Sequence, residues 1–167
     1  LSGYVKVGAD GHVTLVAPQA EMGQGNLTLI AQIIAEELGA DWRTIGIEPA
    51  PVNLHYANPT LSALFKGKSW STIALQGTDD ALDITPLEPA IRRAAAGARI
   101  LLCMAAGERL NASWEACTTE NGFVVRGNDK LRFGELAEEA AAFSLPKTIA
   151  LRTGKRAMVL GRLKAAA

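Results

Sequence analysis

Two glycines flank a glutamine in the stretch Met22-Gly23-Gln24-Gly25, directly before a strongly helical pattern. The first backbone N–H groups of a helix have no acceptors within the helix, and the helix dipole makes this end positive. Glycine lacks the Cβ atom that would keep a ligand at a distance, and it adopts the backbone angles of a sharp loop. The Gln24 side chain adds an amide that both donates and accepts hydrogen bonds. The loop is therefore suited to a phosphate group or a polar heterocycle.

A structural interpretation of the same glycines is that they only turn the chain from a strand into a helix. The pattern lacks the third glycine of a dinucleotide-binding fingerprint and the Lys-Ser/Thr pair of a P-loop. The residues alone therefore predict a candidate anion site and nothing more specific. Thr28 lies in the first helical turn, where its hydroxyl would either face the same ligand or cap the helix. We interpret Glu21, directly before the loop, as a solvated or structural side chain and not as a catalytic base.

The loop is expected between a β-hairpin and a helix. Residues 3–18 alternate apolar and polar side chains around Asp10-Gly11, which predicts two strands joined by a tight turn. After the loop, apolar residues follow helical spacing: Leu27, Ile30, Ala31, Ile34 and Leu38. This spacing predicts a helix with one buried stripe, Asn26 as its N-cap and Gly39 just after its end.

The middle of the chain carries weaker signals. Residues 44–51 are predicted to form a short strand that ends at two prolines, and residues 52–80 an irregular connection. A second long helix is predicted from the capping box of Thr85 and Glu88, with Pro86 at the first helical position.

The last third predicts more short elements. Residues 117–133 indicate three short strands with an Asn-Gly turn, residues 134–143 a shorter helix, and residues 148–152 a closing strand. The order of elements predicts an α+β fold, in which a mixed sheet with hairpins packs against two longer helices and one short helix. No internal repeat or low-complexity linker divides the chain, so we expect residues 1–167 to form a single domain, as a segment of a larger subunit.

Composition excludes several classes of function. The chain is 49% hydrophobic and 20% charged, as in ordinary globular proteins. Its 17 basic and 17 acidic residues cancel, and only 5% of residues are aromatic, so no nucleic-acid partner is expected. Cys103 lies in an apolar run and is predicted to be buried, whereas Cys117 is predicted to begin a strand. Neither cysteine belongs to a metal-binding pattern.

The segment EMGQGNLTLIAQIIAEELGADWRTIGIEPAP resembles the molybdenum-cofactor-binding subunits of the xanthine oxidase family. It is similar in particular to the branch of the isoquinoline 1-oxidoreductase beta subunit and the membrane-associated aldehyde dehydrogenases. Further motifs of that branch follow in the same order: Tyr56-Ala57-Asn58, Gln76-Gly77-Thr78, IRRAAAGARILL and GELAEEAAA. The similarity covers nearly the whole chain, and it implies that the fold is part of a molybdopterin-binding domain.

The resemblance also implies a set of cofactor-binding residues. They are Met22, Gly23, Gln24, Gly25 and Thr28 at the first loop, and Gln76, Gly77 and Thr78 at the second. In the family the glutamine loop contacts the pterin and phosphate portion of the cofactor. After Thr78 the branch usually carries two glycines and a serine, whereas this chain carries Asp79, Asp80 and Ala81. Two carboxylates would repel an anionic cofactor unless they point outward, so the second loop is either displaced, shifted in register or no longer a contact.

Family members hydroxylate an aldehyde or an N-heterocycle with oxygen from water, and a glutamate serves as general base. The implied cofactor is the molybdenum cofactor, as molybdopterin or as its cytosine dinucleotide. The implied partners are the remainder of the molybdenum subunit, a [2Fe-2S] subunit whose iron–sulfur clusters take the electrons, and in some relatives a cytochrome subunit. The general base of relatives lies in segments not present here, so we expect neither a catalytic nor a metal-ligating residue and no turnover by this chain alone.

Two other functions remain open at this point: a stand-alone phosphate or nucleotide binder, and a purely structural interaction domain. An exposed apolar surface next to the Gly23 loop would indicate a missing companion and not a self-sufficient pocket. The compartment is also open, between the bacterial periplasm or membrane, as in relatives, and the cytoplasm.

Overall fold

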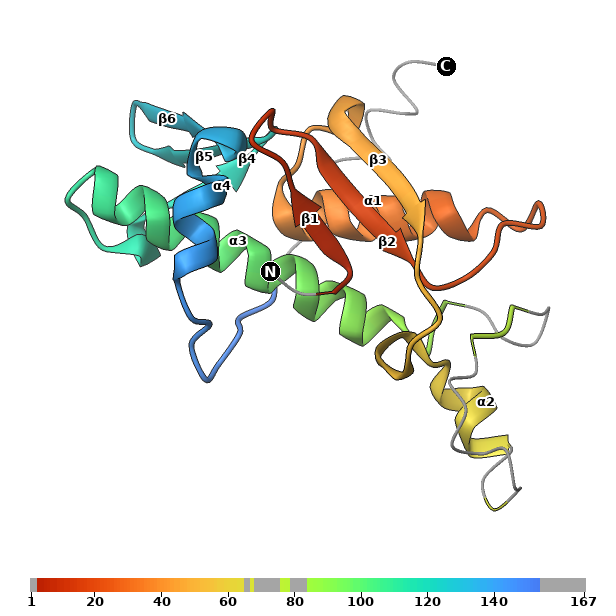
Figure 1. Ribbon diagram of the computed structural model, residues 1–167. Coiled ribbons are helices and arrows are strands. Elements are labelled where there is room, and N and C mark those ends of the chain that lie inside the picture. The colour runs from red at the N-terminus through yellow and green to blue at the C-terminus, as the bar shows by residue number, and fades with distance from the viewer. Residues whose placement is uncertain (1–2, 65–66, 68–75, 79–83, 154–167) are drawn as a thin grey trace.

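The computed structural model describes most of the chain: residues 3–64, 67, 76–78 and 84–153. The longest element, α3 (Glu88–Arg109), is central and packs against α1 (Asn26–Leu38) and α4 (Phe133–Ala142). Two three-stranded sheets lie against these helices (Figure 1). Among the described residues, no helix is both long and apolar enough to span a bilayer.

The first sheet contains the predicted hairpin and one further strand. Its strands in spatial order are β1 (Val5–Val7), β2 (Val13–Ala17) and β3 (Ile45–Pro49). β1 and β2 are antiparallel, whereas β2 and β3 are parallel with α1 as the crossover between them. Val13 and Leu15 of β2 and Ile30 and Ile34 of α1 are fully buried in the core. Because β2 and β3 run parallel, the segments that follow them leave from the same edge of the sheet (Figure 1).

The second sheet is an antiparallel meander beside the far end of α3. It consists of β4 (Thr118–Glu120), β5 (Phe123–Arg126) and β6 (Asp129–Arg132). Asn121 and Gly122 both adopt positive φ angles, 50° and 81°, as a two-residue hairpin turn requires. Phe133 and Leu136 of α4 are fully buried, so this short helix joins the second sheet to the common core.

These observations confirm the predicted α+β class, the first hairpin, the two longer helices and the short one. The strands form two separate sheets, of which only the first is mixed. The described part of the irregular connection is more ordered than the sequence predicted. It contains the short helices η2 (Leu54–Tyr56) and α2 (Pro59–Leu64); two other single turns, η1 (Trp42–Thr44) and η3 (Trp114–Ala116), lie elsewhere.

The predicted starts of both long helices were wrong by a few residues. Gly25 is the N-cap of α1, and Asn26 is its first helical residue. α3 begins at Glu88 with Leu87 as its N-cap, so Pro86 lies outside the helix. Asn26 and Thr85 have side chains that N-caps prefer, but the N-cap of α1 lies one residue before Asn26 and that of α3 two residues after Thr85.

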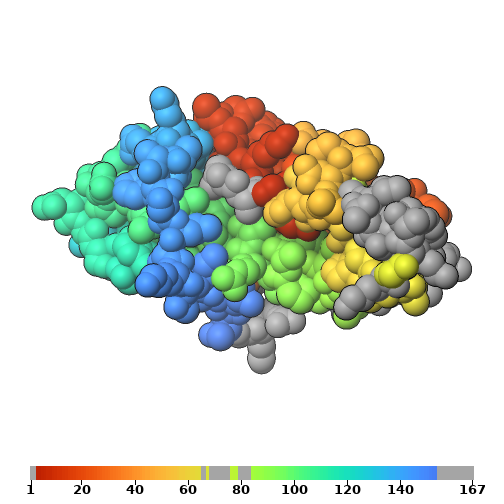
Figure 2. Space-filling view, turned by 60° about the horizontal axis from the view of Figure 1, so that its bottom comes forward, coloured from red at the N-terminus to blue at the C-terminus, as the bar shows by residue number. Residues whose placement is uncertain are grey.

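Residues 148–152 do not form the predicted strand. Their backbone is held by the half-buried Arg99 and the buried Glu37: the Ala150 carbonyl accepts from Arg99 Nη2 at 2.6 Å, and the Arg152 N–H donates to Glu37 Oε1 at 2.9 Å. The Arg152 guanidinium in turn donates to Thr119. The segment after α4 therefore lies along α3, where its surface borders that of the helix (Figure 2).

Candidate functional site

The glycine loop is closed by one carboxylate. Glu21 Oε1 accepts from the N–H groups of Gly23 and Gly25 at 2.8 and 2.9 Å, and Glu21 Oε2 accepts from Leu27 N–H at 3.2 Å. Hydrogen bonds from the N–H groups of Gly25 and Leu27 lower the pKa of the Glu21 carboxyl. Glu21 thus occupies the place that an anionic ligand would take at the start of α1.

Both functional groups of the Gln24 side chain are also used inside the loop. Gln24 Oε1 accepts from Met22 N–H at 2.5 Å, and Gln24 Nε2 donates to the Ala20 carbonyl at 2.9 Å. The loop is therefore a self-satisfied turn, and the expectation of free backbone donors around Gln24 was wrong. Of the two predicted roles of Glu21, solvated or structural, these contacts support the structural one.

The loop nevertheless leaves room for a ligand. Residues 21–25 are exposed, and a Cβ atom built on Gly23 or Gly25 would meet no atom within 4 Å. Both glycines have positive φ angles, 98° and 81°, which other residues adopt only with strain. The Thr28 side chain is exposed and does not cap α1, which removes one of its two predicted roles.

The second predicted segment lies beside the first. Thr78 Oγ1 accepts from the Ala20 N–H at 2.9 Å, and Gln76 Oε1 accepts from the Asn53 N–H at 2.9 Å. Gln76, Gly77 and Thr78 therefore bridge the segments that leave β2 and β3. Asp79, Asp80 and Ala81 lie outside the described residues.

Several polar residues support this edge. Under the loop, Asn26 Nδ2 donates to Gln19 Oε1 at 3.1 Å, and both side chains are buried. Asn58 Oδ1 accepts from Thr60 N–H at the start of α2, while its buried Nδ2 has no hydrogen-bond partner among the described residues. Sequence periodicity does not reveal such residues, because the contacts join separate segments or depend on burial.

Large apolar side chains are exposed at the same edge. Met22 in the loop is 61% exposed, and Val52 and Leu54 after β3 are 83% and 68% exposed. Leu64 at the end of α2 is 66% exposed. The segments that carry Met22, Val52 and Leu54 leave the same end of the parallel pair (Figure 1). Exposed apolar residues gathered near one end of a sheet are typical of a surface that another polypeptide covers.

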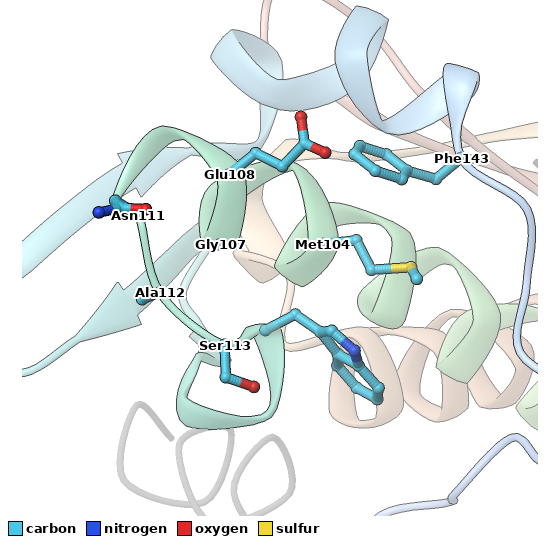
Figure 3. A pocket seen from close by; sticks show the side chains of 8 residues that line it. Met104, Gly107, Glu108, Asn111, Ala112, Ser113 and Phe143 are labelled. Atoms are coloured by element: carbon cyan, nitrogen blue, oxygen red, sulfur yellow. The ribbon is translucent and has the colours of Figure 1, made fainter.

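A separate pocket lies at the other end of α3 and contains none of the predicted site residues (Figure 3). Its volume is about 620 Å³. Apolar walls come from Met104, Trp114 and Phe143, and polar groups from Glu108, Asn111 and Ser113. Among the described residues, no three His, Cys, Asp or Glu side chains are grouped to hold a metal ion.

An α+β segment with a parallel strand pair and a glycine-bounded loop at the carboxyl ends of its strands is typical of a ligand-binding domain. Residues 2–158 match the family model of the molybdopterin cofactor-binding domain. The chain belongs to this family.

The chain is also similar to two curated proteins. The chain is 32% identical to the isoquinoline 1-oxidoreductase subunit beta of Brevundimonas diminuta, over 80% of this chain and 16% of that protein. It is 26% identical to a membrane-bound aldehyde dehydrogenase [pyrroloquinoline-quinone] of Gluconacetobacter polyoxogenes, over 80% of this chain and 15% of that protein. The chain thus spans about a sixth of the length of the curated relatives it matches.

The fold also matches a solved structure. Quinoline 2-oxidoreductase from Pseudomonas putida 86 aligns with a TM-score of 0.58 and 21% identity, over 90% of this chain and 18% of that chain. This likeness shows that the two proteins share a fold.

Proposed function

We propose that this chain supplies one wall of the molybdenum cofactor site in a larger hydroxylase. That enzyme would oxidise an aldehyde or an N-heterocycle with oxygen from water. The observation that carries the proposal is the contact of two motifs from distant parts of the sequence. Ala20, just before the glycine loop, donates its N–H to Thr78 Oγ1 at 2.9 Å across 58 positions.

The residues at this edge fit a large heterocyclic ligand in part. Exposed Gln24, Thr28 and Met22 and the open space at both glycines can receive it, and Gln76–Thr78 would border it. The amides bound to Glu21 do not offer a free anion site. When bound, the cofactor supplies the redox chemistry, while these residues hold and orient it. The cofactor would be molybdopterin or its cytosine dinucleotide.

The rest of the site would come from other segments. The remainder of the molybdenum subunit would supply the general base, a [2Fe-2S] subunit would accept the electrons, and a cytochrome subunit is a further proposed partner. Four apolar side chains are exposed near the loop, as expected where another polypeptide segment covers the site: Met22, Val52, Leu54 and Leu64. This exposure favours a cofactor site shared with other segments over a stand-alone phosphate or nucleotide binder. A periplasmic or membrane-associated location stays a prediction from the resemblance.

The test is cofactor retention by the full-length polypeptide, expressed with its partner subunits in a host that makes the molybdenum cofactor. Gln24→Ala removes the exposed amide of the glycine loop and its hydrogen bonds to the Met22 N–H and the Ala20 carbonyl. We therefore expect molybdenum and pterin content to fall at least fivefold. Molybdenum is measured by mass spectrometry and pterin by fluorescence after oxidation.

Gln32→Ala is the matched control, because Gln32 is a half-buried residue later in α1. This control should retain both components at the wild-type level, and thermal unfolding should show that both variants fold. Wild-type content of molybdenum and pterin in Gln24→Ala would remove Gln24 from the site.

A further inference from the structure

We infer that Glu21 is a positioning residue. Its carboxylate fixes the glycine loop in the conformation that binds the ligand, and it occupies the backbone N–H groups at the start of α1 so that anions cannot bind them. The loop would then present a neutral, hydrogen-bonding face to its ligand. The effect on the cofactor rests on the proposed function, whereas the effect on the loop rests on the contacts of Glu21 alone.

Three donors converge on this carboxylate from the next six residues. Gly23 and Gly25 donate to Oε1, and Leu27 donates to Oε2. These include N–H groups that a helix start leaves without acceptors. The two glycine N–H groups can point to one oxygen because both glycines have positive φ angles. Glu21 therefore fixes a backbone conformation that would otherwise be one of many open to a glycine-rich segment.

A carboxylate suits these donors better than other side chains. It carries two accepting oxygens, so both the Oε1 pair and the Oε2 contact are satisfied at once. In Glu21→Gln an NH₂ group would replace one of the oxygens and face a backbone N–H. The amide would keep at most part of the contacts, and alanine would keep none.

The same contacts limit what the loop can bind. A phosphate that approached these amides would have to displace Glu21, which is tethered to the loop and would remain close by as a second negative charge. Negatively charged parts of a ligand are therefore disfavoured at this helix start. Gln24 uses one N–H and one lone pair inside the loop, so its second N–H and lone pair can still bind a neutral polar edge, as can the exposed Thr28 side chain. Negative groups of the proposed cofactor would need cations or amides from other segments.

The experiment compares Glu21→Ala, Glu21→Gln and the control Glu138→Gln in the full-length polypeptide. Glu138 is an exposed glutamate on α4, away from the loop. Hydrogen exchange of peptides covering residues 21–28 is measured first on protein without cofactor. We expect exchange at least tenfold faster in Glu21→Ala, an intermediate rate in Glu21→Gln and no change in the control. Exchange within twofold of wild type in Glu21→Ala would overturn the proposal.

The second readout is molybdenum and pterin content after expression with cofactor. We expect at least a threefold loss in Glu21→Ala, with partial rescue in Glu21→Gln. If the loop loosens but wild-type content is kept, Glu21 does not position the loop for its ligand. If wild type itself retains no molybdenum, the proposed function fails, while the exchange result still decides the role of Glu21 in the loop.

The third readout uses inorganic phosphate as the probe, titrated into cofactor-free protein by calorimetry. Wild type should bind phosphate no more tightly than Glu21→Ala, because Glu21 occupies the loop amides. Tighter binding by wild type would contradict the closure of this helix start to anions. The Glu21→Gln variant provides the same comparison if Glu21→Ala does not fold.

Discussion

The buried ion pair between α1 and α3 provides a quantitative test of how the segment after α4 is held. Glu37 is 2% exposed, and its Oε1 accepts from Arg99 Nη2 at 3.2 Å and from the Arg152 N–H at 2.9 Å. Glu37→Ala removes this acceptor from two donors at once. We expect the segment around Ala150 to detach more often from α3.

The size of the effect follows from the burial of the pair. When the segment detaches it loses the hydrogen bond from the Arg152 N–H to the buried Glu37 carboxylate, and a hydrogen bond to a charged group contributes about 1.5–3 kcal/mol. Arg99 keeps part of its stabilisation, because its side chain is 18% exposed and it still donates to the Glu37 and Ala150 carbonyls at 3.1 and 2.6 Å. Because the lost acceptor is a buried carboxylate, we expect the upper part of this range, about 2–3 kcal/mol, which corresponds to an open population about 30- to 150-fold larger.

Limited trypsin digestion measures this population, because the Arg152 guanidinium must leave Thr119 before the protease can bind it. Cleavage after Arg152, followed by mass spectrometry, should accelerate about 30- to 150-fold in Glu37→Ala. Glu37→Gln keeps an accepting oxygen without the charge and should lie between wild type and Glu37→Ala.

The control is an ion pair of the same type on the surface. Arg43 Nη2 lies 2.7 Å from Asp41 Oδ2, but the Arg43 side chain is 85% exposed. Arg43→Ala should change cleavage after Arg152 less than about fivefold, because exposed pairs contribute at most about 1 kcal/mol. Equal cleavage rates in Glu37→Ala and wild type would refute the role of Glu37 in attaching this segment.

Two further predictions concern glycine and cysteine. Gly39→Ala should lower the thermal unfolding midpoint more than Gly127→Ala. Both glycines have positive φ angles, 76° and 57°. A Cβ atom at Gly39 would lie 2.6 Å from the Thr119 carbonyl oxygen, whereas one at Gly127 would meet no atom within 4 Å. The strain of a left-handed residue alone is about 1–2 kcal/mol, so a larger loss for Gly127 than for Gly39 would contradict the packing seen at Thr119. Burial raises the pKa of the Cys103 thiol to about 11, whereas Cys117 is partly exposed. At pH 8 iodoacetamide should therefore modify Cys117 first, as followed by peptide mass spectrometry, and faster labelling of Cys103 would show that its core opens.

The fold was predictable where a local pattern determines it. The alternation around Asp10-Gly11 and the apolar spacing after Gly25 follow from the periods of strand and helix, so both elements lie where expected. Residues 148–152 have the composition of a strand, but no neighbouring strand accepts their hydrogen bonds among the described residues. Arg99 and Glu37 bind this segment instead, and they are far from it in the sequence.

The location of the candidate site was predictable for a different reason. A parallel β2–α1–β3 unit brings the segments after both strands to one edge, whatever the side chains there are. The glycine loop and Asn53 lie directly after those two strands, and the Gln76–Thr78 motif binds both segments through the Ala20 and Asn53 N–H groups.

Which groups of the loop are free to bind a ligand could not be predicted from the motif. The glycines and Gln24 indicate a loop with many donors, but each donor selects the best acceptor available, and Glu21 is attached only two residues before the first glycine. An intramolecular carboxylate competes with any dissolved anion at a high effective concentration. A glycine loop that begins with an acidic residue is therefore better suited to shaping itself around a neutral polar group than to binding phosphate.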